Sequence, residues 1–241
     1  MIVCIDSGNS RIKWGVHDGR SWSEQGVVRH AEVAQLADLC RRWPVPARLM
    51  LANVAGPERG AAIGQALAPW SAALSIVKSA ASGGGVRNLY HRPGQLGVDR
   101  WCALVGARRL GSTPRLVVMA GTATTVDSLD GAGNFLGGLI LPGLDLMQRS
   151  LARGTADLPL AAGVYAPFPR STDDAIVSGC REAQVGAIAR AFARLAADDA
   201  CCLLSGGNAE ILSPLLEIPH VLVHNLPQEG LLQLALESSP A

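Results

Sequence analysis

Two short turns carry the residues best suited to phosphate chemistry. The first is Asp6-Ser7-Gly8-Asn9-Ser10, followed by Arg11, Ile12 and Lys13. A glycine in a tight turn between two strands lets backbone N–H groups approach a phosphate closely. Asp6, at the end of the first strand, is suited to Mg²⁺, and Lys13 is suited to phosphate oxygens. Taken alone, this segment also fits an ordinary Asp/Gly/Asn hairpin.

The second turn, Gly121-Thr122-Ala123-Thr124, is equally unspecific by itself. Considered together, the two turns predict a clamp on the phosphates of a nucleotide. A third turn, Ser205-Gly206-Gly207-Asn208, leads into a predicted helix, where its small residues would let an adenine lie against the backbone. The sequence contains no G-x-x-x-x-G-K-[ST] motif, so these turns are not a Walker-type P-loop.

A candidate for acid–base chemistry is Gly97-Val98-Asp99-Arg100, at the start of a predicted helix. Asp99 is suited either to capping that helix or to accepting a proton from a hydroxyl group, with Arg100 binding an anionic group beside it. A carboxylate at a helix N-terminus stays ionised and so remains a proton acceptor.

The composition excludes several classes of protein. Of the 241 residues, 49% are hydrophobic and 17% charged, which excludes a disordered chain or a coiled coil. A net charge of +1 argues against a general nucleic-acid binder. We expect reduced core thiols rather than a zinc site, because the six cysteines form no C-x-x-C pair. No apolar run approaches the roughly 18 residues of a membrane-spanning helix, so we expect a soluble, cytoplasmic protein.

The positions of strands and turns indicate an internal duplication. Residues 1–19 and 115–141 share one plan, in which a strand, a small polar turn, a second strand and a Gly turn follow one another. Helical segments follow each copy, the longest expected from about Asp173 to Ala197 with Thr172 as its cap. We therefore predict two α/β domains, residues 1–113 and 114–241, with a nucleotide cleft between them.

The ordered set of motifs resembles one family over essentially the whole chain. The motifs are Asp6-Ser7-Gly8-Asn9-Ser10 with Lys13, Tyr90 ahead of Gly97-Val98-Asp99-Arg100, Gly121-Thr122-Ala123 with Asp127, Gly137-Gly138 with Pro142-Gly143, and Ser205-Gly206-Gly207. Together they resemble the type III pantothenate kinases of the actin-like, ribonuclease-H-like ATPase superfamily. They also resemble the branch of that family that contains the Bordetella accessory factor, first described as a transcriptional activator.

The resemblance implies ATP-dependent phosphorylation of pantothenate to 4′-phosphopantothenate, the first step of coenzyme A synthesis. It implies that ATP and Mg²⁺ bind the segment from Asp6 to Lys13, and that Thr122 also contacts ATP. It places pantothenate near Tyr90, on Gly97 to Arg100 and on Thr172, with Asp99 as the proton acceptor. It also implies a homodimer with the substrate site at the subunit interface.

One position departs from the family pattern. Most members have D-x-G-T-A in the second turn, and that Asp binds a monovalent cation, K⁺ or NH₄⁺. This chain has Met119-Ala120-Gly121-Thr122-Ala123, with a thioether in place of the carboxylate. We therefore expect no monovalent-cation site, although Asp127 is a carboxylate from which such a site could be rebuilt.

Two alternatives remain open from the sequence. One is a regulatory or DNA-associated accessory protein that keeps the kinase fold without the activity. The net charge of +1 and the lack of a clustered basic face argue against direct DNA binding by such a protein. The other is a kinase of the same superfamily that acts on a sugar or another small alcohol.

Overall fold

The structure is a computed structural model and describes residues 1–237, which divide into two units. Unit 1 contains Met1–Ser112, the short segment Gly133–Phe135 and the described residues from Asn225 onward. Unit 2 contains Thr113–Ala132 and Leu136–His224. The division therefore differs from the expected ranges 1–113 and 114–241, because two later segments of the chain join the first unit.

Unit 1 is built on a five-stranded sheet in the order β3-β2-β1-β4-β5. Its strands are β1 (Ile2–Ser7), β2 (Arg11–His17), β3 (Trp22–Arg29), β4 (Arg48–Asn53) and β5 (Leu74–Ile76). The first three form antiparallel hairpins, and β4 and β5 add in parallel beside β1. The hairpins predicted for residues 1–19 are thus confirmed.

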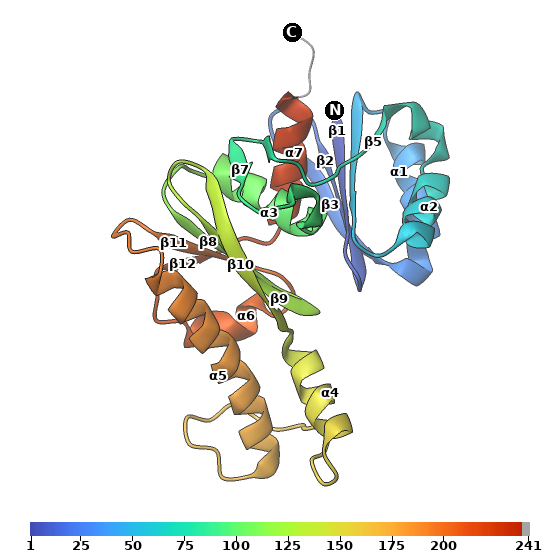
Figure 1. Cartoon of the computed structure of the whole chain (residues 1–241). Coiled ribbons are helices and arrows are strands. Elements are labelled where there is room, and N and C mark those ends of the chain that lie inside the picture. Colours follow the sequence, from blue (N-terminus) through green and yellow to red (C-terminus); the bar gives the residue numbers. More distant parts are fainter. Residues whose placement is uncertain (238–241) are drawn as a thin grey trace. The chain divides into compact units, whose positions relative to one another are not determined.

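Helices cover both faces of this sheet (Figure 1). On one face lie η1 (His30–Leu36), α1 (Ala37–Arg42), α2 (Pro57–Ala66) and η2 (Ala68–Ala73). Alternate strand residues such as Val3, Ile5 and Val16 pack there against Leu36 and Ile63. The opposite face is covered by α3 (Val98–Arg109) and α7 (Leu226–Glu237), which pack closely on each other. Between β5 and α3 in the sequence come the short elements β6 (Ser82–Gly83), β7 (Val86–Asn88) and η3 (Pro93–Gln95), of which β6 and β7 pair with each other.

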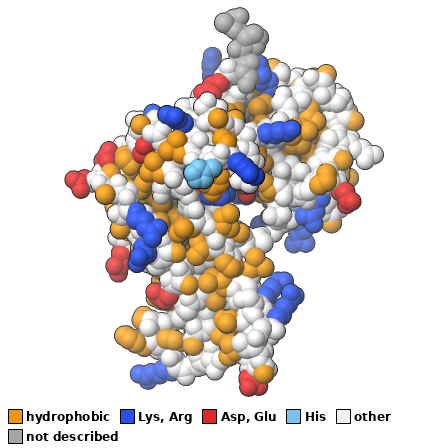
Figure 2. All heavy atoms as spheres, viewed as in Figure 1, with side chains coloured by type: hydrophobic (Ala, Val, Ile, Leu, Met, Phe, Trp, Pro, Cys, Tyr) orange, Lys and Arg blue, Asp and Glu red, His pale blue; other side chains and the backbone are white. Residues whose placement is uncertain are grey.

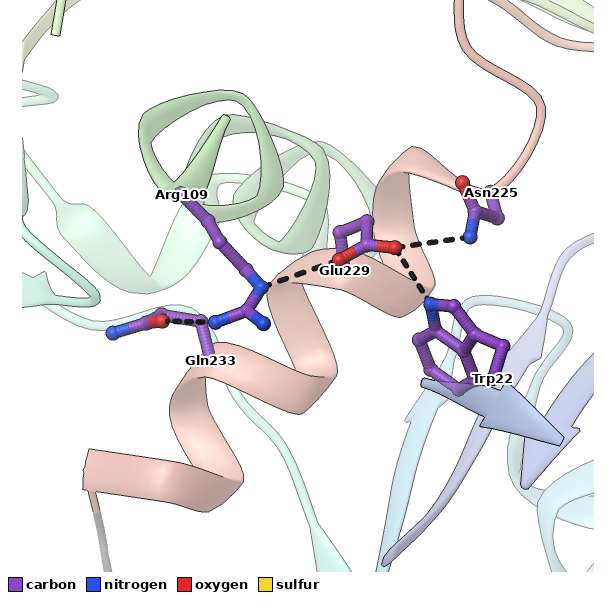
Figure 3. A network of polar contacts seen from close by, with 5 residues as sticks. All are labelled: Trp22, Arg109, Asn225, Glu229 and Gln233. Carbon is purple, nitrogen blue, oxygen red and sulfur yellow. Dashed lines mark hydrogen bonds and ion pairs between the residues drawn. The ribbon is translucent and has the colours of Figure 1, made fainter. Parts of the chain in front are cut away.

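The C-terminal helix α7 is fixed in unit 1 by a polar network around Glu229 (Figure 3). One carboxylate oxygen accepts from Trp22 Nε1 at 2.6 Å and from Asn225 Nδ2 at 3.1 Å, and the other accepts from Arg109 Nε at 3.2 Å. Arg109 also donates to Gln233 Oε1 at 3.0 Å. Glu229 therefore ties α7 to both β3 and the end of α3.

Unit 2 repeats the same sheet order with β12-β11-β8-β9-β10. The strands are β8 (Arg115–Ala120), β9 (Ala123–Leu129), β10 (Asn134–Pro142), β11 (Cys201–Ser205) and β12 (His220–Leu222). The helical elements are α4 (Leu144–Gly154), α5 (Thr172–Ala193), α6 (Ala209–Leu212) and η4 (Ser213–Leu215). Leu116, Val118 and Val126 form the core of this unit with Ile176 and Ile188 of α5.

The repeated strand order confirms the internal duplication and the predicted fold of two ribonuclease-H-like α/β units. One strand serves both units, because Asn134 and Phe135 at the start of β10 pair with Arg87 and Asn88 of β7. All six cysteines lie within residues 1–237 and are free thiols, as expected. No helix in that range has the length and apolar character needed to cross a membrane.

Candidate functional site

The first predicted phosphate turn is the hairpin between β1 and β2. Gly8 N donates to Arg11 O at 3.1 Å, which closes the turn, and Asp6 pairs with Lys13 across the two strands. Paired residues point to the same face of a sheet, so the carboxylate and the ammonium lie on one side of the hairpin. Ser7 is fully buried, and its Oγ has no hydrogen-bond partner within the described part of the chain.

Two side chains that the sequence analysis did not single out hold this turn. His30 Nε2 donates to Gly8 O at 2.7 Å, and Arg59 Nη1 donates to Asn9 O at 2.8 Å. Both contacts hold carbonyl oxygens of the turn, which restricts the orientation of the intervening peptide groups. His30 directly follows β3, and Arg59 lies in the first turn of α2. Both are distant in sequence from residues 6–13, so no local motif there could reveal them.

Asp6 faces the side of the sheet that α3 covers. The pKa of Asp6 is raised to about 6 in this buried position: desolvation is the largest cause, the nearby Asp99 acts in the same direction, and Lys13 opposes the shift. The electrostatic coupling shows that the strand end of β1 and the first turn of α3 bring two carboxyl groups together. The structure thus unites two sequence candidates that lie far apart in the chain.

Helix α3 begins at Val98, with Gly97 rather than Asp99 in the N-cap position. Asp99 lies half-buried in the first turn, and its Oδ1 accepts from the backbone N–H of Arg100 at 2.9 Å. A Cβ at Gly97 would lie 2.6 Å from that same oxygen, so a side chain there would displace the carboxylate. The capping role considered for Asp99 is therefore wrong, and its second oxygen is not committed to capping.

Arg100 is 4% exposed, and its guanidinium lies beside a pair of aromatic rings. Its guanidinium is 5.7 Å from the ring centre of Tyr90 and 5.8 Å from that of Phe135, and its Nη1 donates to Tyr90 Oη at 3.1 Å. The two rings are 5.1 Å apart. The structure thus brings Tyr90 and Arg100 together as expected and adds Phe135, which the sequence analysis missed because it lies on a distant strand.

The glycine turns of unit 2 converge on the hairpin between β8 and β9. Gly143 N donates to Thr122 O at 2.9 Å, and Asn208 N donates to Ala120 O at 2.9 Å. A Cβ at Gly143 would clash with Gly121 O, and one at Gly206, where φ is +102°, would clash with Ala120 O. These close approaches explain why glycine stands at both positions. Thr122 itself is exposed, as is Gly207.

Met119 is the second-to-last residue of β8, close in sequence to this turn. It pairs with Thr125 of β9 and with Ser205 of β11, so the three side chains share one face of the sheet. Asp127 is fully buried and pairs with Val117, two residues back along β8. The carboxylate therefore lies on the Met119 face of the sheet but not directly opposite the thioether.

Thr172 was expected to cap α5, but the cap is Ser171. The Ser171 Oγ accepts from Asp174 N at 3.2 Å, and Thr172 is the exposed first residue of the helix. The helix ends at Ala193 rather than Ala197. Thr172 belongs to unit 2 whereas Tyr90 and Asp99 belong to unit 1, so the fold of neither unit brings these predicted substrate contacts together.

The donor set near Asp6 fits a hard divalent cation. Within residues 1–237 no group of three or more His, Cys, Asp or Glu side chains is placed to hold a metal ion. Mg²⁺, however, typically binds one or two carboxylates together with substrate phosphates and water, rather than an all-protein cage. Asp6, with Asp99 close by, matches that pattern.

Comparisons with known proteins show which family the chain belongs to. The sequence profile described as type III pantothenate kinase matches residues 2–194. The type III pantothenate kinase of Dechloromonas aromatica is 58% identical over 99% of this chain and 100% of that protein. That of Aromatoleum aromaticum is 52% identical over the full length of both. This chain belongs to the type III pantothenate kinase family.

Solved structures share the fold at much lower identity. A candidate Baf family transcriptional activator from Campylobacter jejuni is 17% identical, with a TM-score of 0.67 over 98% of both chains. A candidate 2-dehydro-3-deoxygalactonokinase from Sinorhizobium meliloti is 14% identical, with a TM-score of 0.60 over the full length of both. Family members are kinases, and kinases of this kind use ATP with a divalent metal.

Proposed function

We propose that this chain phosphorylates pantothenate with ATP to give 4′-phosphopantothenate, the first step of coenzyme A synthesis. The observation that carries the proposal is that Asp6, near the end of β1, and Asp99, in the first turn of α3, lie near enough to each other to interact electrostatically. Membership of the type III pantothenate kinase family supplies the acceptor.

Asp99 acts as the general base in this proposal. Its carboxylate accepts the proton of the primary hydroxyl of pantothenate as the hydroxyl oxygen forms a bond to the γ-phosphorus of ATP. The bond from that phosphorus to the bridging oxygen breaks, and ADP leaves. Asp99 is suited to this role because the N-cap position is taken by Gly97.

The turn from Asp6 to Lys13 binds phosphates of ATP in this proposal, and so do Gly121 and Thr122. Mg²⁺, when bound, offsets the charge of the phosphates, and Asp6 is the residue proposed to hold it. Gly206 and Gly207 are proposed to lie against the adenine.

Tyr90, Arg100 and Thr172, with Gly97 and Val98, are proposed to bind pantothenate. A buried guanidinium held by a phenol is suited to a carboxylate ligand, since Arg can offer two parallel N–H donors. We also propose that no monovalent cation, neither K⁺ nor NH₄⁺, is required, because Met119 offers a thioether where most family members have a carboxylate.

A homodimer is the proposed assembly, with Thr172 of the partner subunit reaching the substrate. Apolar side chains are exposed over the part of unit 2 shown in Figure 2. Exposed apolar residues of this unit include Ile140, Leu160, Val164 and Phe168. Phe168 is 88% exposed, and a surface rich in exposed apolar side chains is typical of a protein interface. Light scattering tests the proposal: the parent chain should be dimeric, and Phe168→Asp should shift it toward monomer.

The loop between α4 and α5, which carries Leu160, Val164 and Phe168, is fixed to α5. Ala162 N donates to Asp173 Oδ1 at 3.0 Å, and Val164 N donates to Asp174 Oδ1 at 2.8 Å. A loop that is already ordered loses less conformational entropy on association, which supports its use as an interface. Membership of the branch with the Bordetella accessory factor is proposed from the motif resemblance, and cytoplasmic location is proposed from the cysteine usage.

The experiment that tests the proposed function is ADP release measured with a panel of acceptors. Pantothenate should support turnover, while hexoses, N-acetylated sugars and water alone should not. Mass spectrometry should find one added phosphoryl group on pantothenate. Turnover with a sugar and none with pantothenate would refute the proposed acceptor, and ATP hydrolysis independent of any acceptor would refute the transfer reaction.

A further inference from the structure

Asn88 lies at the end of β7, two residues before Tyr90, and has no assigned role. It is 6% exposed, and its carboxamide makes three hydrogen bonds to the backbone. Nδ2 donates to Ala80 O at 3.2 Å and to Pro93 O at 3.1 Å, and Oδ1 accepts from Tyr90 N at 3.1 Å. One buried side chain thus joins three points of a segment that has little regular structure.

The points that Asn88 joins lie on both sides of Tyr90. The contact with Tyr90 N fixes the backbone from which the phenol projects toward Arg100. The contact with Pro93 O fixes η3, which leads directly into Gly97 and the start of α3. A further bond, from Ser79 Oγ to Leu96 O at 2.7 Å, ties the end of the same segment.

The strand opposite Asn88 supports the same group of residues. Phe135 pairs with Asn88 in parallel register, and Leu89 N donates to Phe135 O at 3.3 Å. The Phe135 ring then packs against Tyr90 and lies near the Arg100 guanidinium. Asn88 therefore anchors the backbone of one aromatic residue and pairs with the other.

The chemistry of the carboxamide matches these contacts closely. An Asn side chain offers two N–H donors and an acceptor, and all three are used. Aspartate has the same size and keeps the acceptor, but it would place a carboxylate oxygen against two carbonyl oxygens. In a buried site that repulsion and the lost donors are costly, so the segment must shift.

We propose that Asn88 is a positioning residue of the acceptor site, which holds Tyr90 against Arg100 and fixes the approach to Asp99. This inference rests on the proposed function, since it takes Tyr90 and Arg100 to bind pantothenate. The inference predicts a selective effect. Loss of the Asn88 contacts should impair the binding of pantothenate and leave the binding of ATP intact, because none of these contacts involves the Asp6 to Lys13 turn.

The test compares Asn88→Asp with the parent and with Asn53→Asp. Asn53, at the end of β4, makes the same kind of turn, with Oδ1 accepting from Ala55 N at 3.1 Å and Nδ2 donating to Gly56 O at 2.8 Å. Asn88→Asp should raise the KM for pantothenate about tenfold or more, the scale of losing one buried hydrogen bond. The KM for ATP should stay within about twofold of the parent value. Asn53→Asp should leave the KM for pantothenate at the parent value.

A double-variant cycle separates positioning from general loosening. If Asn88 acts through Tyr90, Tyr90→Phe should raise the KM for pantothenate in the parent and add little to Asn88→Asp. Full additivity, a parent-like KM in Asn88→Asp, or equal rises in both KM values would overturn the inference.

If Asn88→Asp does not fold, Asn88→Ser, which keeps one donor and one acceptor, replaces it with the same expectations. A parent chain inactive with pantothenate would refute the proposed function and this inference together, whereas an active parent and an indifferent Asn88 refute only the inference.

Discussion

Asp99 lies near enough to Asp6 to raise the pKa of that carboxyl group, although one residue ends the first strand and the other opens the third α-helix. Burial is the larger cause of the shift, and the two causes act in the same direction. Both favour the protonated form of Asp6 in the metal-free protein. Two carboxyl groups this close destabilise the fold when both are ionised, because like charges repel. The same arrangement suits the binding of a divalent cation together with substrate phosphates.

The raised pKa of Asp6 predicts how stability depends on pH. The native chain holds a proton on Asp6 up to pH of about 6, whereas the unfolded chain loses it near pH 3.8. Between these values the native state binds more protons, so this group's contribution to stability is present below pH 3.8 and is lost as pH rises through 6. The loss is on the order of 2–3 kcal/mol, at about 1.4 kcal/mol per pKa unit.

Thermal unfolding in the presence of a chelator measures this effect. Asp6→Asn removes the titration, so the difference in unfolding midpoint between the variant and the parent should grow in favour of the variant from pH 4 to pH 7. A difference that stays constant over this range would show that Asp6 titrates normally in the folded chain.

His30 supports the phosphate turn and should matter for ATP alone. His30→Ala removes the N–H donor to Gly8 O, and we expect the KM for ATP to rise about three- to tenfold, the scale of one hydrogen bond. His30→Gln retains a donor and should recover part of the loss. Steady-state kinetics with each substrate varied in turn decide the matter, and a larger effect on the KM for pantothenate would contradict the role.

The crossing of α3 and α7 should tolerate no side chain at Gly230. A Cβ there would clash with the Cys102 carbonyl group, so Gly230→Ala should lower the free energy of unfolding by about 1–3 kcal/mol. Gly64 in α2 has open space around its Cβ position and serves as the matched control. Gly64→Ala should raise the free energy of unfolding by roughly 0.5–1 kcal/mol. Urea denaturation of both variants tests the pair, and equal effects would show that α7 does not pack as described.

Much of this architecture could be predicted from the sequence, because local signals encode it. The glycine turns after β1 and β8 mark the hairpins, and their recurrence predicts two units of equal strand order. The choice of Ser171 over Thr172 as a cap could not be predicted, because both residue types cap helices and only backbone geometry decides between them. Phe135, His30 and Asn88 were missed because their contacts join segments distant in sequence or lie within an irregular loop.

Met119 predicts independence from monovalent cations. A soft, neutral thioether does not replace a carboxylate oxygen in a K⁺ site, so exchanging K⁺ for Na⁺ at constant ionic strength should leave turnover unchanged. Met119→Asp restores the residue type usual in the family and should make turnover respond to K⁺. Activation of the parent chain several-fold by K⁺, with saturation at millimolar concentrations, would show that Asp127 or another group completes a cation site.

The most direct test of the account is the pantothenate-dependent turnover of Asp99→Asn at saturating Mg·ATP. Asparagine keeps the size of the side chain and its acceptor for the Arg100 N–H, but it cannot take the proton of the acceptor hydroxyl. We expect turnover to fall about 10²-fold or more, the usual scale for a general base, with the Kd for Mg·ATP unchanged by calorimetry. An Asn variant that turns over within a factor of two of the parent would contradict the assignment of Asp99 as the base.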